Sequence, residues 1–159
     1  MGASTCHQQA KSSRPWGAPT EDISLENFMN PDSDTRPTEA RLLEMVFPDH
    51  TNHLGTLFGG QALAWMDKAA FIAASRYSRR SVVTARSERV DFRVPVRQGQ
   101  LVEVIARVAQ IGLSSMQVEV ELFAEDLLDA KRELCTSGRF VMIALDAHGK
   151  PAAVQELES

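Results

Sequence analysis

One long helical segment dominates this 159-residue sequence and limits the folds that it can adopt. From Phe58 to Tyr77 the residues are mostly Ala, Leu, Met, Trp and Ile, with no proline and no glycine after Gly60, a composition typical of an α-helix. Strand patterns lie on both sides of it, at Arg41–Phe47, Ser81–Val94, Leu101–Gln110, Ser115–Ala124 and Arg132–Leu145. We expect the last four to be joined by short hairpin-like connections. Because one helix cannot provide the repeated crossovers of a parallel sheet, we predict an α+β fold in which an antiparallel sheet wraps around one long central α-helix.

The rest of the sequence divides into an extension, a domain and a short tail. Residues 1–38 are rich in Ser, Thr, Pro, Gly, Gln and Asp, and we predict that they are largely disordered, with a turn of helix around Ile23–Met29 as an alternative. We place the folded domain at 39–154 and a C-terminal tail at 155–159. A lone helix covers one face of a sheet, and the apolar content of Asn52–Ala74 exceeds that need, so we expect the chain to self-associate.

The charge and the cysteine content exclude several classes of protein. The formal net charge is −4 and the pI is near 5.6, whereas nucleic-acid-binding proteins are usually basic. Cys6 and Cys135 form no paired motif, as expected in a reducing compartment. The N-terminal residues lack the apolar core of a secretory signal, and no apolar run of about 20 residues is present to span a bilayer. We therefore expect a cytoplasmic protein with no nucleic-acid or membrane partner.

An acidic residue, Asp67, lies in the middle of the predicted helix. The residues three or four positions away, which share its helix face, are all apolar: Leu63, Ala64, Ala70 and Phe71. An unpaired charge in such surroundings costs on the order of several kcal/mol, and burial raises a carboxyl pKa unless something compensates. Asp67 therefore has either a structural partner, such as an arginine or a neighbouring loop, or a chemical role.

Two glycines, Gly59 and Gly60, lie where this helix begins. Free backbone N–H groups at that end, together with the helix dipole, attract anions and carbonyl oxygens. Asp67 follows Gly60 by seven residues, which is two turns along the same face and about 10 Å along the axis. A donor and a carboxylate in this arrangement can act on one carbonyl group if a second subunit or a neighbouring loop closes the gap.

Other chemistries do not fit the spacing of these residues. The segment G-T-L-F-G-G lacks the pattern of a dinucleotide-binding loop, and Gln61 stands where a P-loop needs lysine. His50 and His53 are separated by two residues but have no further ligand in a metal-binding pattern, so we predict no metal site. No serine occupies a nucleophile-elbow motif.

Several segments together are similar to one known family. The pattern Asn52-x-x-Gly55-x-x-x-Gly59-Gly60, with Asp67 seven residues later, resembles the hotdog-fold acyl-CoA thioesterases, in the branch that includes bacterial broad-specificity and cytosolic acyl-CoA hydrolases. The resemblance extends over residues 39–153 through the segments V-V-T-A-R, V-D-F-R-V-P-V-R-Q-G, G-L-S-S and A-L-D-A-H-G-K-P. It implies the hotdog fold, which agrees with the order of elements read from the residues.

The resemblance also implies a reaction, hydrolysis of a fatty acyl-CoA thioester. The acid of the family falls on Asp67, as a general base on water or as a nucleophile. Its helix-start donor falls on the Gly60 N–H, with Gly59 beside it, and its loop asparagine falls on Asn52. The active unit is at least a dimer, often a tetramer or hexamer, with sites between subunits. Coenzyme A enters as part of the substrate, and no separate cofactor is implied.

Binding of the coenzyme A phosphates needs a local cationic patch on an acidic protein. The candidates for this patch are four arginines on or near the second strand, Arg86, Arg89, Arg93 and Arg97, with Ser114 and Ser115 offering hydroxyl groups. The resemblance implies substrate contacts for Arg86 and Ser115. His53 stands where relatives carry a small residue, and we add it to the candidate binding residues. We expect the acyl chain to lie along the helix past Leu63, Trp65 or Met66.

Three rival functions remain on the same fold. A non-catalytic acyl-CoA-binding sensor usually carries a DNA-binding helix-turn-helix upstream, and residues 1–38 lack that pattern. A hotdog dehydratase relies on a histidine near the acid, and His53 could approach Asp67 only from a partner chain. A purely structural domain would not need Asn52, Gly60 and Asp67 together. The sequence therefore favours the thioesterase.

Overall fold

The computed structural model describes residues 36–155 of the chain. The elements, in order, are β1 (Glu39–Met45), the short 3-10 helix η2 (Pro48–His50), α1 (Gly59–Ser78), β2 (Ser81–Phe92), β3 (Leu101–Ile111), β4 (Ser115–Glu125) and β5 (Arg132–Leu145). Each expected strand and the expected helix are present, with ends shifted by two residues or fewer. The predictions for residues 1–35 and 156–159, including the helical turn at Ile23–Met29, fall outside the described residues.

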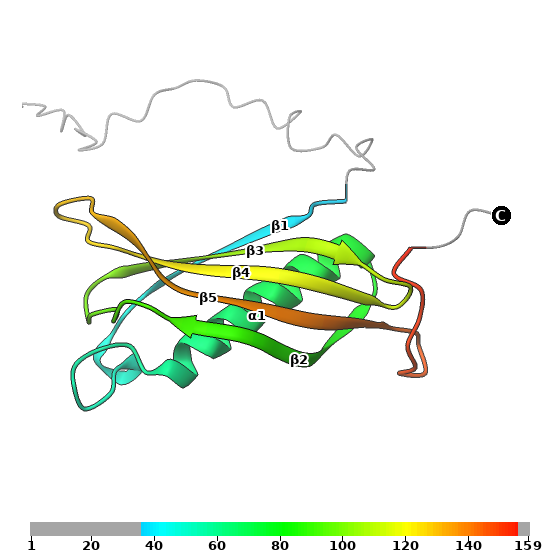
Figure 1. Ribbon diagram of the computed structural model, residues 1–159, viewed down its shortest axis with the longest axis horizontal. Helices are drawn as coiled ribbons and strands as arrows, with labels where there is room; N and C mark the ends of the chain where they lie inside the picture. The colour runs from blue at the N-terminus through cyan, green and yellow to red at the C-terminus, as the bar shows by residue number, and fades with distance from the viewer. Residues whose placement is uncertain (1–35, 156–159) are drawn as a thin grey trace, which may run out of the picture. The chain divides into compact units, whose positions relative to one another are not determined.

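The strands form one five-stranded antiparallel sheet in the order β1-β3-β4-β5-β2 (Figure 1). The expected hairpin between β2 and β3 is wrong, because β2 pairs with β5 at the opposite edge of the sheet from β1. The linker after β2 instead runs past the start of the helix. There Val96 is buried, and its carbonyl accepts the Leu57 N–H at 2.7 Å. With Val96 buried beside the helix, the linker leads to β3 on the other side of the sheet rather than turning back to pair with β2.

Helix α1 lies across one face of the sheet and packs against it through small side chains (Figure 1). Five alanines line the contact and are almost fully buried: Ala62, Ala69, Ala70, Ala73 and Ala74. The facing side chains of β4 follow the expected alternation and are fully buried at Met116, Val118, Val120 and Leu122. The helix ends at Arg79, whose left-handed backbone (φ 54°) lets its N–H donate to the Ser75 carbonyl at 2.9 Å. In the described part of the chain, no helix is long and apolar enough to cross a membrane.

The outer face of the sheet, opposite α1, carries a row of ion pairs. Contacts of 2.7 to 3.1 Å link, in this order, Arg132, Glu103, Arg41, Glu39, Arg107 and Glu121. Bonding to Arg41 and Arg107 holds the pKa of Glu39 below its usual value of 4.5. Arg132 and Arg41 lower the pKa of Glu103 against the opposing effect of partial burial. The pairs tie β1, β3, β4 and β5 together on the side that the helix does not cover.

This row predicts a loss of stability in acid. Because the folded-state pKa of Glu103 is lowered, its contribution is complete above pH 4.5 and is lost as the pH falls through the folded-state value. We expect Glu103→Gln to lower the free energy of unfolding at pH 7 by about 0.5–1 kcal/mol, and the difference from wild type to vanish in stronger acid. Denaturant titrations across this pH range measure it. Glu44→Gln, which removes a 3.9 Å pair with Lys68, is the control, and a Glu103 effect independent of pH would contradict the assignment.

Candidate functional site

The carboxylate of Asp67 has a polar partner that the sequence did not reveal. Its Oδ1 accepts a hydrogen bond from the Thr84 hydroxyl at 2.6 Å, and the side chain is half-buried rather than enclosed by apolar neighbours. Thr84 lies near the start of β2, opposite the buried Met142 of β5, so that it faces the helix. One carboxylate oxygen of Asp67 is therefore held by a strand, while Oδ2 has no partner among residues 36–155. The only signal for Thr84 was its place in the V-V-T-A-R segment.

The start of α1 presents free backbone donors. Phe58 caps the helix with extended backbone and no side-chain hydrogen bond. Its carbonyl accepts the N–H groups of Gln61 and Ala62 at 2.9 and 3.0 Å, while the Gly59 and Gly60 N–H groups bond to no other described residue. A Cβ atom on Gly60 would lie 2.6 Å from the Phe58 ring, so a larger residue there would have to displace that ring. The helix start thus fits a site for a carbonyl oxygen or an anion.

Asn52 organises the loop before the helix. Its Oδ1 accepts hydrogen bonds from the Leu54 N–H at 2.9 Å, the Thr56 N–H at 3.3 Å and the Thr56 hydroxyl at 3.2 Å. Its backbone N–H donates to the Thr56 carbonyl at 2.8 Å. These bonds leave the side-chain NH₂ as a free donor with respect to residues 36–155. His53 follows at the exposed tip of the loop.

The two loop histidines lie in different surroundings. The His50 ring packs edge-on against Trp65, with centroids 5.2 Å apart, and its Nδ1 accepts the Phe47 N–H at 3.3 Å. His53, by contrast, is exposed. Across residues 36–155 there is no group of three or more His, Cys, Asp or Glu side chains placed to hold a metal ion.

An apolar cavity of about 280 Å³ opens beside the helix start. It is lined by Gly59 and Ala62 of the helix, by Phe92 and Arg93 at the end of β2 and by Leu57, Val94, Pro95, Val96 and Thr136. Two residues of the expected acyl path, Trp65 and Met66, are instead buried in the core. The cavity therefore offers an apolar ligand a place at the first turn of the helix rather than along its middle.

The candidate substrate contacts on the strands are dispersed. Arg86 is exposed and pairs with Glu88 at 2.7 Å, whereas Arg93 donates to the Ser137 hydroxyl at 3.3 Å. Ser114 and Ser115 lie at the turn into β4. Ser115 stands opposite Ile143 of β5, which stands opposite Val83 of β2, so Ser115 is at the same end of the sheet as Thr84.

Within one chain the candidate residues thus fall into two groups. The helix-start group consists of Asn52, His53, Gly59, Gly60 and Arg93, and the mid-helix group consists of Asp67, Thr84, Arg86, Ser114 and Ser115. Two helical turns, about 10 Å of axial rise, separate the Gly60 donor from the Asp67 carboxylate.

Comparison with known proteins identifies the family of this chain. A family model described as the thioesterase superfamily matches residues 54–131. An uncharacterized acyl-CoA thioester hydrolase of Bacillus subtilis is 41% identical over 109 residues, which are 69% of this chain and 63% of that protein, less than two thirds of its length. An uncharacterized acyl-CoA thioester hydrolase of Zymomonas mobilis is 30% identical over 116 residues, which are 73% of this chain and 78% of that protein. The chain therefore belongs to the thioesterase superfamily.

Solved structures give the same family and its fold. The acyl-CoA hydrolase of Staphylococcus aureus, in complex with butyryl coenzyme A, coenzyme A and coenzyme A disulfide, is 35% identical with a TM-score of 0.71, covering 74% of this chain and 71% of that one. A hexameric acyl-CoA thioesterase is 36% identical with a TM-score of 0.72, covering 74% and 75%. The five-stranded sheet with its single long helix is the hotdog fold.

Three of the residues considered above have the same spacing as three positions replaced by alanine in that Staphylococcus aureus protein. Its structures include variants of an aspartate, an asparagine and a threonine. The asparagine precedes the aspartate by fifteen residues, and the threonine follows it by seventeen. Asn52, Asp67 and Thr84 have the same two spacings in this sequence.

The loop hydrogen bonds of Asn52 lead to a measurable expectation. In Asn52→Ala the amides of Leu54 and Thr56 lose their acceptor, so their hydrogen exchange should become about five- to tenfold faster, as for loss of a bond worth about 1 kcal/mol. Amides in the core strand β4 should keep their protection. His53→Ala is the matched control, because its side chain bonds to no described residue. Unchanged exchange at Leu54 and Thr56 in Asn52→Ala would contradict this role.

Proposed function

We propose that the protein hydrolyses acyl-CoA thioesters at two equivalent sites, each formed between two copies of the chain. The observation that carries the proposal is the 2.6 Å hydrogen bond that fixes the Asp67 carboxylate against Thr84 of an edge strand. This acid is two helical turns from the free N–H of Gly60, so a second copy has to supply the donor. Similarity to acyl-CoA hydrolases, including one solved with butyryl coenzyme A, supports the substrate class.

The edge strand β2 supplies the geometry for the pairing. It pairs with β5 on one side only, and nine of its twelve residues are exposed, which leaves a row of backbone groups open to another strand. Two copies of β2 paired antiparallel about a twofold axis place the end of one strand beside the start of the other. Because Phe92 adjoins Gly59 and Thr84 adjoins Asp67, this brings the helix-start group of one copy to the mid-helix group of its partner.

The chemistry then follows from these groups. The Gly60 N–H donates to the thioester carbonyl oxygen and stabilises the negative charge that develops there. Asp67 takes a proton through Oδ2 from a water molecule, whose oxygen attacks the carbonyl carbon. The carbon–sulfur bond breaks, and the coenzyme A thiolate leaves and recovers a proton. In the alternative, Asp67 attacks the carbonyl carbon directly and the thiolate leaves, which forms a mixed anhydride; water that then attacks the Asp67 Cγ releases the fatty acid and leaves one solvent ¹⁸O in the Asp67 carboxylate after a single turnover.

The remaining candidate residues hold the two ends of the substrate. The apolar cavity beside Gly59 takes the acyl chain, since its lining is hydrophobic apart from Arg93 and Thr136. Asn52 offers its free NH₂ to the water or to the thioester. Arg86, Arg93, Ser114 and Ser115 are assigned to the coenzyme A part, with His53 at the rim. Hexameric relatives support an assembly of such pairs, and the cytoplasmic location remains a prediction.

Replacing the acid tests the reaction. Asp67→Asn should reduce kcat/KM for the preferred acyl-CoA at least about 100-fold, the scale expected of an acid–base group. Thr84→Val should give a smaller loss of about tenfold, because the carboxylate remains but is no longer held. Release of free thiol from acyl-CoAs of short to long chains measures both and identifies the preferred chain. Binding of acyl-CoA without turnover by the wild type would replace this function with that of a sensor.

Mixing subunits tests the shared site. Gly60→Pro removes the donor N–H, and proline is tolerated in the first turn of a helix, while Gly60→Ala keeps the N–H but has the same contact with the Phe58 ring. Inactive Asp67→Asn and inactive Gly60→Pro, unfolded and refolded together, should regain about a quarter of the wild-type activity, because each mixed pair contains one intact site. Absence of recovery, with mixed pairs demonstrated by mass spectrometry, would place the site within one chain.

A further inference from the structure

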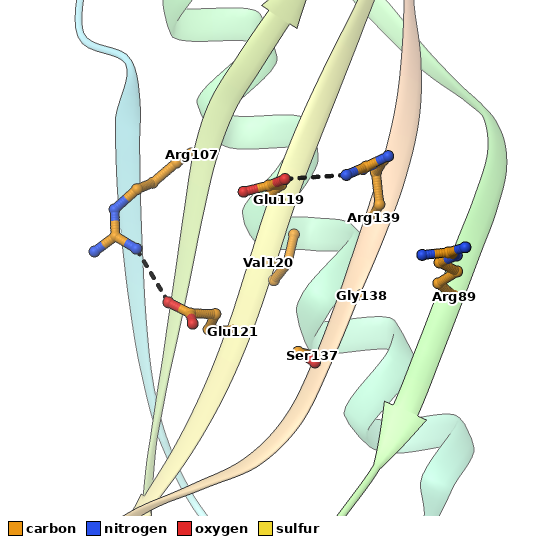
Figure 2. Close-up of a pocket in the computed structure, with 8 residues that line it drawn as sticks. All are labelled: Arg89, Arg107, Glu119, Val120, Glu121, Ser137, Gly138 and Arg139. Atoms are coloured by element: carbon orange, nitrogen blue, oxygen red, sulfur yellow. Dashed lines mark hydrogen bonds and ion pairs between the residues drawn. The ribbon is translucent and has the colours of Figure 1, made fainter.

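A second cavity lies on the outer face of the sheet, away from α1. It has a volume of about 330 Å³ and is lined by Arg89, Arg107, Glu119, Val120, Glu121, Ser137, Gly138 and Arg139 (Figure 2). Its walls are the charged outward side chains of β3, β4, β5 and β2, with the helix behind the sheet in this view. The family assignment and the reaction proposed above make no use of it.

The charges around this outer cavity do not balance. Arg107 bonds Glu121 at 3.1 Å, and Arg139 bonds Glu119 at 3.1 Å, so each carboxylate is matched by one guanidinium. Arg89 has no anionic partner among residues 36–155. Figure 2 shows Arg139 between Glu119 and Arg89, which places two cations in succession at the β5–β2 side. An anion between Arg139 and Arg89 would complete the alternation of charges.

Neighbouring acids do not supply that anion. Glu88, which stands directly opposite Arg139 in the strand register, is bonded to the Arg86 Nε at 2.7 Å. Asp91 stands opposite Ser137, but its carboxylate contacts no described basic side chain. The arginine pair is therefore left with one net positive charge on a partly enclosed surface, where a phosphate group gains charge-assisted hydrogen bonds from planar guanidinium groups.

The backbone at this point is shaped to place Arg89. The pairing of β2 with β5 shifts register between Glu88 and Asp91, and Arg89 takes a left-handed conformation, φ 47°, which is unfavourable for a residue with a Cβ atom. The next residue, Val90, packs toward the helix side, where its Cγ2 lies 3.1 Å from the position of a Cβ on Gly138. Glycine at 138 thus accommodates the bulge that sends Arg89 to the opposite face.

The two cavities share a border. Arg93 lines the apolar cavity at the helix start, and it donates to the hydroxyl of Ser137, which lines the outer cavity, at 3.3 Å. Strand β2 ends at Phe92, and the strand pairing proposed above ends with it, so a ligand can pass between the two faces beyond that residue. We propose that the outer cavity binds a phosphate ester of the coenzyme A part of the substrate between Arg89 and Arg139, an inference that rests on the proposed function.

Kinetics with two thioesters of the same acyl group test the site. One substrate is the acyl-CoA and the other is the acyl-pantetheine, which lacks every phosphate. Arg89→Gln should raise KM for the acyl-CoA about tenfold with kcat unchanged, and leave both constants for the acyl-pantetheine unchanged. Arg76→Gln, an equal change of charge on the exposed last turn of α1, should alter neither. Salt should raise the wild-type KM for acyl-CoA more steeply than that of Arg89→Gln.

A second variant separates binding from folding. Arg89→Gly removes the same guanidinium but suits a positive φ, so its Tm should equal or exceed that of the wild type while its KM for acyl-CoA rises as in Arg89→Gln. Equal changes of KM for both thioesters would overturn the proposal. So would dissociation of the oligomer in Arg89→Gln with unchanged affinity for coenzyme A, which would make Arg89 an interface residue.

Calorimetric titration with coenzyme A keeps this inference separate from the hydrolysis. Even if neither thioester is hydrolysed, the wild type should bind coenzyme A about tenfold more tightly than Arg89→Gln, and pantetheine equally weakly in both. Equal affinities of the two proteins for coenzyme A would reject the phosphate site whatever the fate of the proposed reaction.

Discussion

The close contact between the alanine face of α1 and the sheet is the constraint on which the rest of this structure depends. Only small side chains let a helix lie so near a sheet without voids or overpacking, and Ala69, Ala70, Ala73 and Ala74 are fully buried there. This contact fixes where each turn of the helix meets β2. The first turn lies beside Phe92 and the third beside Thr84, so the packing of the core determines the placement of the candidate site.

The sequence predicted this arrangement wherever a local signal was strong. Residue composition located α1 and strand patterns located the five strands, whereas the short helix η2 was not predicted. The glycines at the start of α1 and the acid within it are readable because both lie on one continuous helix. Thr84 was missed because its relation to Asp67 depends on the pairing of β2 with β5, which joins residues far apart in sequence. The hairpin after β2 was wrongly expected for a similar reason. The path of that linker depends on the burial of Val96 beside Leu57, a contact that no turn motif in the sequence indicates.

Charged side chains were the least predictable part of the site. Arg86 and Arg89 lie on β2 and Arg93 directly follows it. The three look alike in the sequence, yet each has different surroundings in the fold. Arg86 forms an ion pair with Glu88, and Arg93 donates a hydrogen bond to Ser137. The Arg89 side chain is turned outward by the bulge and has no partner in the described chain. Strand alternation alone cannot separate these cases, because the register shifts in β2 change which residues face outward.

The edge strands also bear on solubility. A long exposed edge such as β2 would template uncontrolled strand addition if it stayed open. In the proposed pair each copy covers the β2 edge of the other, which leaves β1 as the remaining edge of the joined sheet. That strand is only seven residues long and carries Glu39, Arg41 and Glu44, features that discourage further addition. The same strand pairing that assembles the candidate sites would thus end growth at a finite size and protect the protein from fibre formation.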